Sequence, residues 1–171
     1  MTRPLRLTLV LGGARSGKSA FAEGLVTAAP APWTYIATAQ AFDEEMRRRI
    51  ATHRARRGAE WRTIEAPQEL PAAVLEAAAE RPLLVDCLTL WLSNRLIAGA
   101  DMGADRDAVL AALARRIAPT VLVSSEVGLS IVPDNALARA FRDAAGELHQ
   151  AAARAADRVY LVVAGCPIVA K

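Results

Sequence analysis

The stretch Gly12-Gly13-Ala14-Arg15-Ser16-Gly17-Lys18-Ser19 decides the fold. It matches the pattern G-x-x-x-x-G-K-[ST], whose glycines let several backbone N–H groups converge on phosphate oxygens. A short apolar run precedes the stretch and a run of helical character follows it, which is the context that this motif requires. The alternative is a glycine-rich turn with an incidental lysine, but the full pattern arises by chance in only about 1% of chains this long. We therefore predict a P-loop at residues 12–19.

The motif predicts a role for three side chains. Lys18 is expected to reach the β and γ phosphates of a bound triphosphate, and the Ser19 hydroxyl is expected to bind Mg²⁺. Asp86 follows the apolar run Leu83-Leu84-Val85, so it is a second candidate ligand of the metal or of its water shell. The alternative for Asp86 is to cap the helix that starts at Leu88, a common role for aspartate.

Outward from the motif, short apolar runs alternate with longer alanine-rich segments, which is typical of a parallel sheet covered by helices. We predict strands at residues 5–11, 33–37, 83–87, 120–124 and 159–164. Helices are predicted at residues 17–28, 43–57, 68–79, 88–98, 105–117 and 135–156, with a flexible connection at 98–105 and a loop at 128–134. The predicted fold class is α/β: one domain over residues 1–171 with a three-layer, RecA-like P-loop NTPase fold and a mainly parallel central sheet.

Composition narrows the function classes. The chain is 53% hydrophobic and 23% charged, close to the globular average, so a disordered or fibrous protein is not expected. The net charge is +3, and Lys18 and Lys171 are the only lysines among 21 basic residues. Arginine suits bidentate phosphate contacts, but no long basic run points to nucleic acid. We expect a small-molecule enzyme that does not bind nucleic acid.

The apolar segments and the cysteine spacing indicate where the protein is located and in which redox state its thiols are. The longest apolar run, residues 159–170, contains a glycine and a proline and is shorter than the roughly 20 residues of a membrane span. We expect a buried strand followed by a loop there, no membrane insertion, and a cytoplasmic protein because residues 1–6 do not begin a signal peptide. Cys87 and Cys166 lack metal-ligand spacing, so both are predicted to be reduced thiols in the core.

The segment at residues 43–57 carries a second candidate group. Acidic residues begin it and arginines end it, as the helix dipole favours, and Met46, Ile50 and His53 share one helical face. A neutral imidazole can attack a phosphoryl group, so His53 is a candidate nucleophile, with Arg54, Arg56 and Arg57 stabilising phosphate charge. The alternative is a hydrogen-bonded histidine at a helix end beside solvated arginines, and spacing alone favours this alternative.

Longer motifs resemble one family across essentially the whole chain. They are GGARSGKS at 12–19, YIATA at 35–39, RIATHRARR at 49–57, WRTIEAP at 61–67, LLVDCLTLWLSN at 83–94, SSEVGLSIVPDNALARAFRDAAGELHQ at 124–150 and VYLVVAGCPIVAK at 159–171. The chain resembles the bifunctional adenosylcobinamide kinase/adenosylcobinamide-phosphate guanylyltransferases of cobalamin biosynthesis. The P-loop alone is generic, whereas the histidine segment and EVGLSIVP are specific to this family among P-loop folds.

The resemblance implies two reactions. Adenosylcobinamide is phosphorylated on its aminopropanol hydroxyl from ATP or GTP, and GMP is then transferred from GTP onto that phosphate with release of pyrophosphate. The family uses a guanylylated histidine, which by motif match is His53. The resemblance therefore favours His53 as the nucleophile over His53 as a structural histidine at a helix end. The same match implies nucleotide contacts from the P-loop and from further residues: Ala37, Thr38, Ala39, Arg54, Ala55, Arg56, Arg57, Glu65 and Asp86. In the family a glutamate stands at the position of Asp86, so the carboxylate here is shorter.

The resemblance also implies a homo-oligomer, specifically a trimer, and it assigns no catalytic role to His149. Two rival functions remain at the level of sequence. One is a P-loop kinase for another small molecule, in which His53 is structural. The other is a nucleotide-dependent regulator or nucleic-acid-binding module without catalysis.

Overall fold

One sheet of seven strands organises the residues described by the computed structural model, which are 5–40, 44, 48 and 57–171. The strand order is β3-β2-β4-β5-β1-β6-β7, and all neighbours are parallel except the final pair. The strands are β1 (Leu7–Gly12), β2 (Trp33–Ala37), β3 (Trp61–Glu65), β4 (Leu83–Asp86), β5 (Thr120–Ser125), β6 (Arg158–Val163) and β7 (Cys166–Val169). The predicted, mainly parallel α/β sheet is confirmed.

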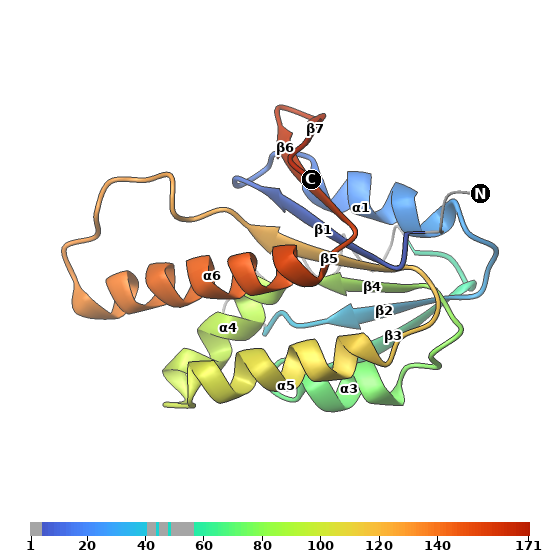
Figure 1. Ribbon diagram of the computed structural model, residues 1–171, viewed down its shortest axis with the longest axis horizontal. Helices are drawn as coiled ribbons and strands as arrows, with labels where there is room; N and C mark the ends of the chain where they lie inside the picture. The colour runs from blue at the N-terminus through green and yellow to red at the C-terminus, as the bar shows by residue number, and fades with distance from the viewer. Residues whose placement is uncertain (1–4, 41–43, 45–47, 49–56) are drawn as a thin grey trace.

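Helices cover both faces of the sheet, as Figure 1 shows. Helix α1 lies on one face against β1, β4 and β5, while α3, α4, α5 and α6 lie on the other face. Their bounds are α1 (Lys18–Thr27), α3 (Leu70–Glu76), α4 (Leu88–Ile97), α5 (Met102–Ala114) and α6 (Ala136–Ala155). The arrangement has the three predicted layers.

The central strands are apolar on both faces because both faces are covered. In β4, Leu83 and Val85 join the core beneath α3–α6, whereas Leu84 between them joins the core beneath α1. Strand β5 alternates in the same way, with Leu122 on the first side and Val123 on the second. Continuous apolar runs of this kind are characteristic of parallel strands buried on both sides.

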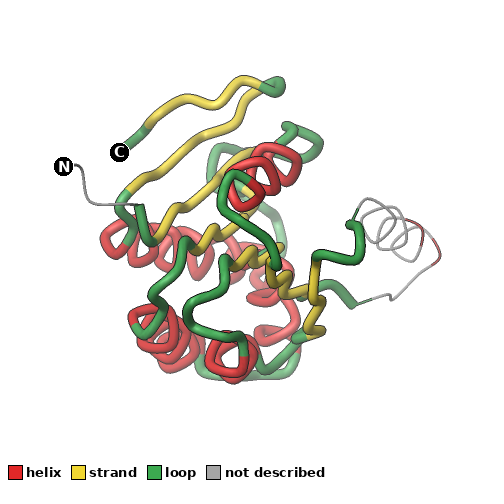
Figure 2. Tube along the Cα trace, turned by 90° about the vertical axis from the view of Figure 1, so that its right-hand side faces the viewer, coloured by secondary structure: helices red, strands yellow, loops and turns green. Residues whose placement is uncertain are grey.

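The prediction missed the two outermost strands of the sheet, β3 and β7. Strand β3 is short and half polar, and every residue of β7 is exposed, so neither carries the apolar signal of a central strand. The loop predicted after residue 164 is instead a hairpin, because Ala164 and Gly165 adopt positive φ angles of 50° and 80° and reverse the chain. Figure 2 shows this hairpin at one margin of the sheet.

Two further expectations are wrong in detail. Cys166 lies on β7 and is exposed, so only Cys87 is a core thiol. Helix α5 begins at Met102 inside the predicted flexible connection, because the Asp101 carboxylate accepts hydrogen bonds from the N–H groups of Gly103 and Ala104 and caps it.

Most of the helix predicted at 43–57 lies outside the described residues. Within the described part of the chain, no helix is both long and apolar enough to cross a membrane.

Candidate functional site

The eight-residue P-loop connects the end of β1 to the start of α1, as predicted. A side chain at Gly12 would place its Cβ 2.7 Å from the Val162 carbonyl oxygen, so this position requires glycine. Gly17 has a φ of 92° and precedes the first helical residue, Lys18. The positive φ suits glycine and turns the loop back on itself, so the amino end of α1 points into the loop. This geometry suits an anion, because N–H groups and the positive end of the helix dipole converge there.

The C-terminal hairpin supports this loop from behind. Gly165, at the turn of the hairpin, donates from its N–H to the Ser16 carbonyl oxygen over 2.8 Å. Its Cα would lie only 3.3 Å from a Cβ added to Gly17. The hairpin that the sequence did not predict therefore helps to hold the P-loop in shape.

Lys18 spans the loop, with its Nζ donating to the Gly13 carbonyl oxygen over 3.0 Å. Lys18 and Ser19 are half-buried at the first turn of α1, and Arg15 is exposed with a φ of 55°. The Ser16 Oγ is buried and has no hydrogen-bond partner among the described residues. The loop thus holds hydrogen-bonding capacity that the described protein does not satisfy.

A buried hydrogen-bond network joins the ends of β2 and β4 beside the loop. The fully buried Thr38 hydroxyl donates to the Cys87 carbonyl oxygen over 2.7 Å and accepts from the Cys87 N–H over 2.8 Å. Asn94 on α4 donates from Nδ2 to the Thr38 carbonyl oxygen over 2.9 Å. The network fixes where Asp86, which precedes Cys87 and pairs in register with Ala37, leaves the sheet.

Asp86 does not cap the following helix. The N-cap of α4 is Cys87, and no side chain makes a capping hydrogen bond there, so the alternative role of Asp86 is wrong. Burial raises the pKa of the Cys87 thiol to about 11, the charge of Asp86 adds to this rise, and Lys18 opposes it. Asp86 and Lys18 therefore act electrostatically on the same buried residue.

The candidate metal ligands have suitable chemistry. The Ser19 hydroxyl and the half-buried Asp86 carboxylate are oxygen donors, which Mg²⁺ prefers. Among the described residues, no group of three or more histidine, cysteine, aspartate or glutamate side chains forms a metal cage. Mg²⁺ in phosphate sites commonly uses one or two protein ligands and completes its shell with phosphate and water, so the residues present fit it.

Arg57 is the described member of the predicted arginine group. Its guanidinium lies 3.5 Å from the centre of the Tyr35 ring, and Trp61 packs edge-on against the same ring at 6.3 Å. Arg57 Nε and Nη1 are buried and make no hydrogen bond within the described residues. Burial, followed by the charge of Asp86, raises the pKa of Tyr35, so its phenol is neutral beside Arg57. His53, Arg54, Ala55 and Arg56 lie outside the described residues.

Neighbouring strand registers bring the other predicted residues to one end of the sheet, which we call the carboxyl edge. Glu65 at the end of β3 pairs with Ala37 of β2, and Ala37 pairs with Asp86 of β4. Strand β5 lies next to β4, and its last residue, Ser125, pairs with Gly12 of β1. Thr38 and Ala39 follow β2 at the same edge. Their contacts with a nucleotide stay predictions.

Glu126 and His149 are also part of this edge, although the sequence analysis assigned neither of them a role in the site. Glu126 follows β5 and donates its backbone N–H to the Gly12 carbonyl oxygen over 2.9 Å. The buried His149 on α6 makes a 2.7 Å hydrogen bond through Nε2 to Ser124 Oγ, and its Nδ1 is 3.9 Å from Glu126 Oε2. The signal that identified Asp86, a carboxylate after an apolar strand, also applies to Glu126.

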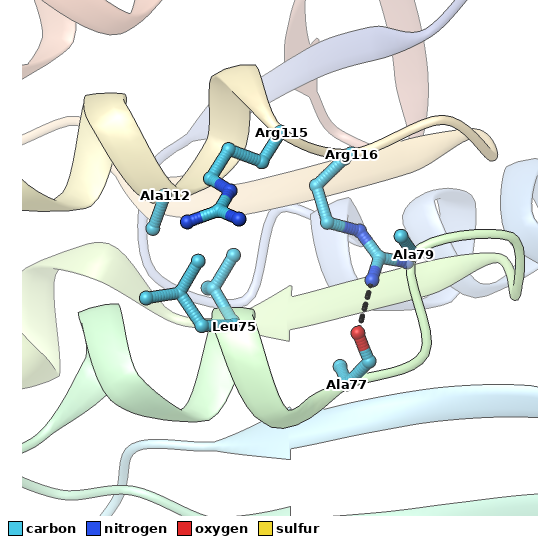
Figure 3. A pocket seen from close by; sticks show the side chains of 7 residues that line it. Leu75, Ala77, Ala79, Ala112, Arg115 and Arg116 are labelled. Carbon is cyan, nitrogen blue, oxygen red and sulfur yellow. Dashed lines mark hydrogen bonds between the residues drawn. The ribbon is translucent and has the colours of Figure 1, made fainter.

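A hollow at the opposite end of the sheet, the amino edge, has a different character. It lies between α3 and α5 and is lined mainly by alanine and by Leu75, with Arg115 and Arg116 at its wall (Figure 3). Arg116 is buried and donates from Nη1 to the carbonyl oxygens of Ala77 and Ala78 over 2.7 Å each. Its Nη2 donates to the Arg81 carbonyl and its Nε to Thr120 Oγ1. The protein itself therefore satisfies the Arg116 guanidinium at this hollow.

Sequence comparison identifies close relatives. A family model described as cobinamide kinase/cobinamide phosphate guanyltransferase matches residues 8–170. The chain is 52% identical over 166 residues to the bifunctional adenosylcobalamin biosynthesis protein CobP of Pseudomonas aeruginosa, covering 95% of this chain and 96% of that protein. It is 41% identical over 184 residues to the bifunctional adenosylcobalamin biosynthesis protein CobU of Salmonella typhimurium, covering 96% and 99% of the two chains.

Structural comparison supports the fold alone. A prototypical ATPase from the type III secretion system of pathogenic bacteria superposes with a TM-score of 0.57 at 11% identity. The match covers 91% of this chain but only 50% of the ATPase chain. A Pyrococcus horikoshii protein from the structural study of PH0250 superposes with a TM-score of 0.54 at 8% identity, covering 97% and 86% of the two chains.

Proposed function

The chain belongs to the cobinamide kinase/cobinamide phosphate guanyltransferase family, and we propose that both reactions take place at the carboxyl edge of its sheet. It is an enzyme of adenosylcobalamin biosynthesis with kinase and guanylyltransferase activity. In the first reaction, ATP or GTP phosphorylates the aminopropanol hydroxyl of adenosylcobinamide. In the second, GTP transfers GMP to that phosphate and pyrophosphate leaves. The observation that carries the proposal is the P-loop geometry, in which Lys18 crosses a glycine-rich turn at the start of a helix.

The P-loop is the proposed triphosphate site. N–H groups of residues 13–19 bind the phosphate oxygens, and Lys18 moves from the Gly13 carbonyl to the β and γ phosphates. Ser19 and Asp86 would hold Mg²⁺, which would neutralise phosphate charge when bound. Ala37, Thr38, Ala39 and Glu65 contribute further nucleotide contacts from the ends of β2 and β3.

Guanylyl transfer is proposed to pass through His53. Its imidazole attacks the α phosphorus of GTP, a P–N bond forms, and the bond to the β-phosphate oxygen breaks to release pyrophosphate. The phosphate of adenosylcobinamide phosphate then displaces the histidine and takes GMP. The sequence motif around His53 supports this step, and so does Arg57, which follows four residues later in the sequence. Arg57 has buried donors that make no hydrogen bond within the described residues. Arg54 and Arg56 are proposed to act with it on the phosphates.

The decisive experiment uses GTP labelled at the α phosphate. We expect an acid-labile, alkali-stable adduct that is absent in His53→Ala. The chain has two histidines, and the second, His149, is buried against Ser124, so peptide mapping of the label identifies the nucleophile. Active kinase that forms no adduct would favour the simpler P-loop kinase. Tight, salt-dependent nucleic-acid binding without cobinamide turnover would favour the regulator.

We also propose a homo-oligomer, a trimer, located in the cytoplasm, where nucleoside triphosphates are available. Four large apolar side chains support association, because they are more than half exposed on the loop before α6 and on its first turn: Leu129, Ile131, Val132 and Leu137. Exposed apolar clusters of this kind mark contact surfaces. Light scattering that reports the mass of a single chain would reject this assembly.

A further inference from the structure

Glu126 occupies the strand next to the P-loop strand. Ser125 pairs in register with Gly12, and the Glu126 N–H donates to the Gly12 carbonyl oxygen over 2.9 Å. Asp86 ends β4, on the far side of β5, and Glu65 ends β3, which is further still. Of the described acidic residues that follow the parallel strands at the carboxyl edge, Glu126 is therefore tied most directly to the phosphate loop.

The two oxygens of the Glu126 carboxylate are in different situations. Oε1 accepts a hydrogen bond from the Gly128 N–H, which orients the group. Oε2 lies 3.9 Å from His149 Nδ1, too far for a hydrogen bond, and makes none with the described residues. The side chain is 23% exposed, so it is accessible from outside yet held in place. One oxygen is thus oriented and available as an acceptor.

The neighbouring histidine does not engage this carboxylate in an ion pair. Burial lowers the pKa of His149, and the charge of Glu126 only partly opposes this effect, so the imidazole is neutral near pH 7. Its 2.7 Å hydrogen bond to Ser124 fixes the ring. The order Ser124, His149, Glu126 resembles a hydrolase triad, but Ser124 is completely buried and no substrate can reach its hydroxyl.

We propose that Glu126 is a catalytic residue of the kinase step, in which its Oε2 binds the acceptor hydroxyl of cobinamide and takes its proton. This inference rests on the proposed function. The hydroxyl oxygen forms a bond to the γ phosphorus, and the bond from that phosphorus to the β–γ bridging oxygen breaks. The nucleoside diphosphate leaves with that electron pair, and the hydroxyl proton passes to Glu126. Phosphoryl transfer enzymes commonly use a carboxylate for this task.

Gly128 is the proposed positioning residue. A Cβ at Gly128 would lie 2.9 Å from Glu126 Oε1, closer than such atoms approach, and the obstacle is the end of a flexible side chain. Gly128→Ala therefore displaces the carboxylate without removing it. Guanylyl transfer needs no proton from a hydroxyl, because its acceptor is already a phosphate, so neither residue should matter for that reaction.

The test compares Glu126→Gln and Gly128→Ala with wild type in both half-reactions. We expect Glu126→Gln to lower the kinase kcat by about 10²- to 10⁴-fold, with Gly128→Ala intermediate. Both variants should bind GTP and form the His53 adduct as wild type does. Glu147→Gln is the charge-matched control, since Glu147 is exposed on α6 and pairs with Arg106, and it should leave both reactions unchanged.

Three outcomes would overturn the inference. One is a Glu126→Gln kinase kcat within threefold of wild type. Another is a parallel loss of GTP binding, adduct and kinase turnover, which would mean that Glu126 is structural. The third is a wild-type enzyme that phosphorylates no cobinamide, and this result would reject the proposed function as well. Normal adduct formation in wild type with an unaffected Glu126→Gln kinase would reject the inference alone.

Discussion

Arg116 at the amino edge of the sheet and the P-loop at the carboxyl edge use their polar groups in opposite ways. At the amino edge, the Arg116 guanidinium is buried and donates to three backbone carbonyls and one hydroxyl of the protein. At the carboxyl edge, the Ser16 Oγ of the P-loop is buried without a hydrogen-bond partner among the described residues. A buried polar group without a partner costs about 1 to 3 kcal/mol. Arg116 therefore serves stability, whereas the P-loop keeps binding capacity for a ligand.

The largest expected effect is the loss of activity when Lys18 of the P-loop is replaced. Lys18→Ala should reduce triphosphate use in steady-state kinetics by roughly 10³-fold, about 4 kcal/mol, because the charge on the transferred phosphoryl group is lost. Its only side-chain hydrogen bond within the described residues is to Gly13, so the unfolding midpoint should change little.

The chain offers a matched control for this variant. Lys171 is the only other lysine, and its Nζ caps carbonyls at the end of α6, including that of Ala156 at 2.6 Å. Lys171→Ala should lower stability by about 1 kcal/mol and leave turnover unchanged. Unaltered kinetics in Lys18→Ala would contradict the placement of the site.

The second-largest expected effect is a loss of stability without a loss of nucleotide binding, and it concerns Arg116 at the amino edge. Arg116→Met should lower the free energy of unfolding by about 3 kcal/mol, because the carbonyls of Ala77, Ala78 and Arg81 lose their donor. Nucleotide affinity of the folded variant should equal that of wild type. Urea unfolding followed by circular dichroism measures the first quantity, and titration with nucleotide measures the second.

Arg115→Met tests whether this effect belongs to the buried guanidinium. Arg115 lines the same hollow, but its exposed side chain makes no hydrogen bond or ion pair within the described residues, so the loss of stability should stay within about 0.5 kcal/mol. Equal destabilisation by both variants would show that the carbonyl contacts of Arg116 do not stabilise the amino edge.

The smallest effect concerns the two thiols. Cys87 is buried at the carboxyl edge, and its thiol pKa is raised to about 11. Near pH 8, therefore, only about one Cys87 thiol in 10³ is ionised. Cys166 is exposed on β7. A thiol reagent should label one cysteine in the native protein and two in urea, and Cys166→Ser should abolish the native labelling. Rapid labelling of Cys87 in the native protein would mean that the carboxyl edge opens and exposes this buried thiol.

Sequence reasoning succeeded where the signal is local. The central strands could be predicted because burial on both faces demands an unbroken apolar run, as in Leu83-Leu84-Val85. It failed at the margins, where β3 buries its side chains only in part, β7 exposes all of its residues, and both strands depend on pairing. The helix start at Met102 was missed because two glycines suggested a flexible linker, whereas the Asp101 cap outweighed their low helix propensity.

The sequence by itself determined the P-loop, because eight contiguous residues encode the backbone turn and its lysine, and its longer contiguous motifs determined the family. Only the tertiary structure decided which distant groups meet beside that loop. Gly165 supports Ser16, Thr38 locks Cys87, and Glu126 joins Gly12, although these pairs are separated by 49 or more residues along the chain. Such contacts depend on the order in which strands pair in the sheet. Strand order arises from non-local packing of the whole chain, so no local pattern records it.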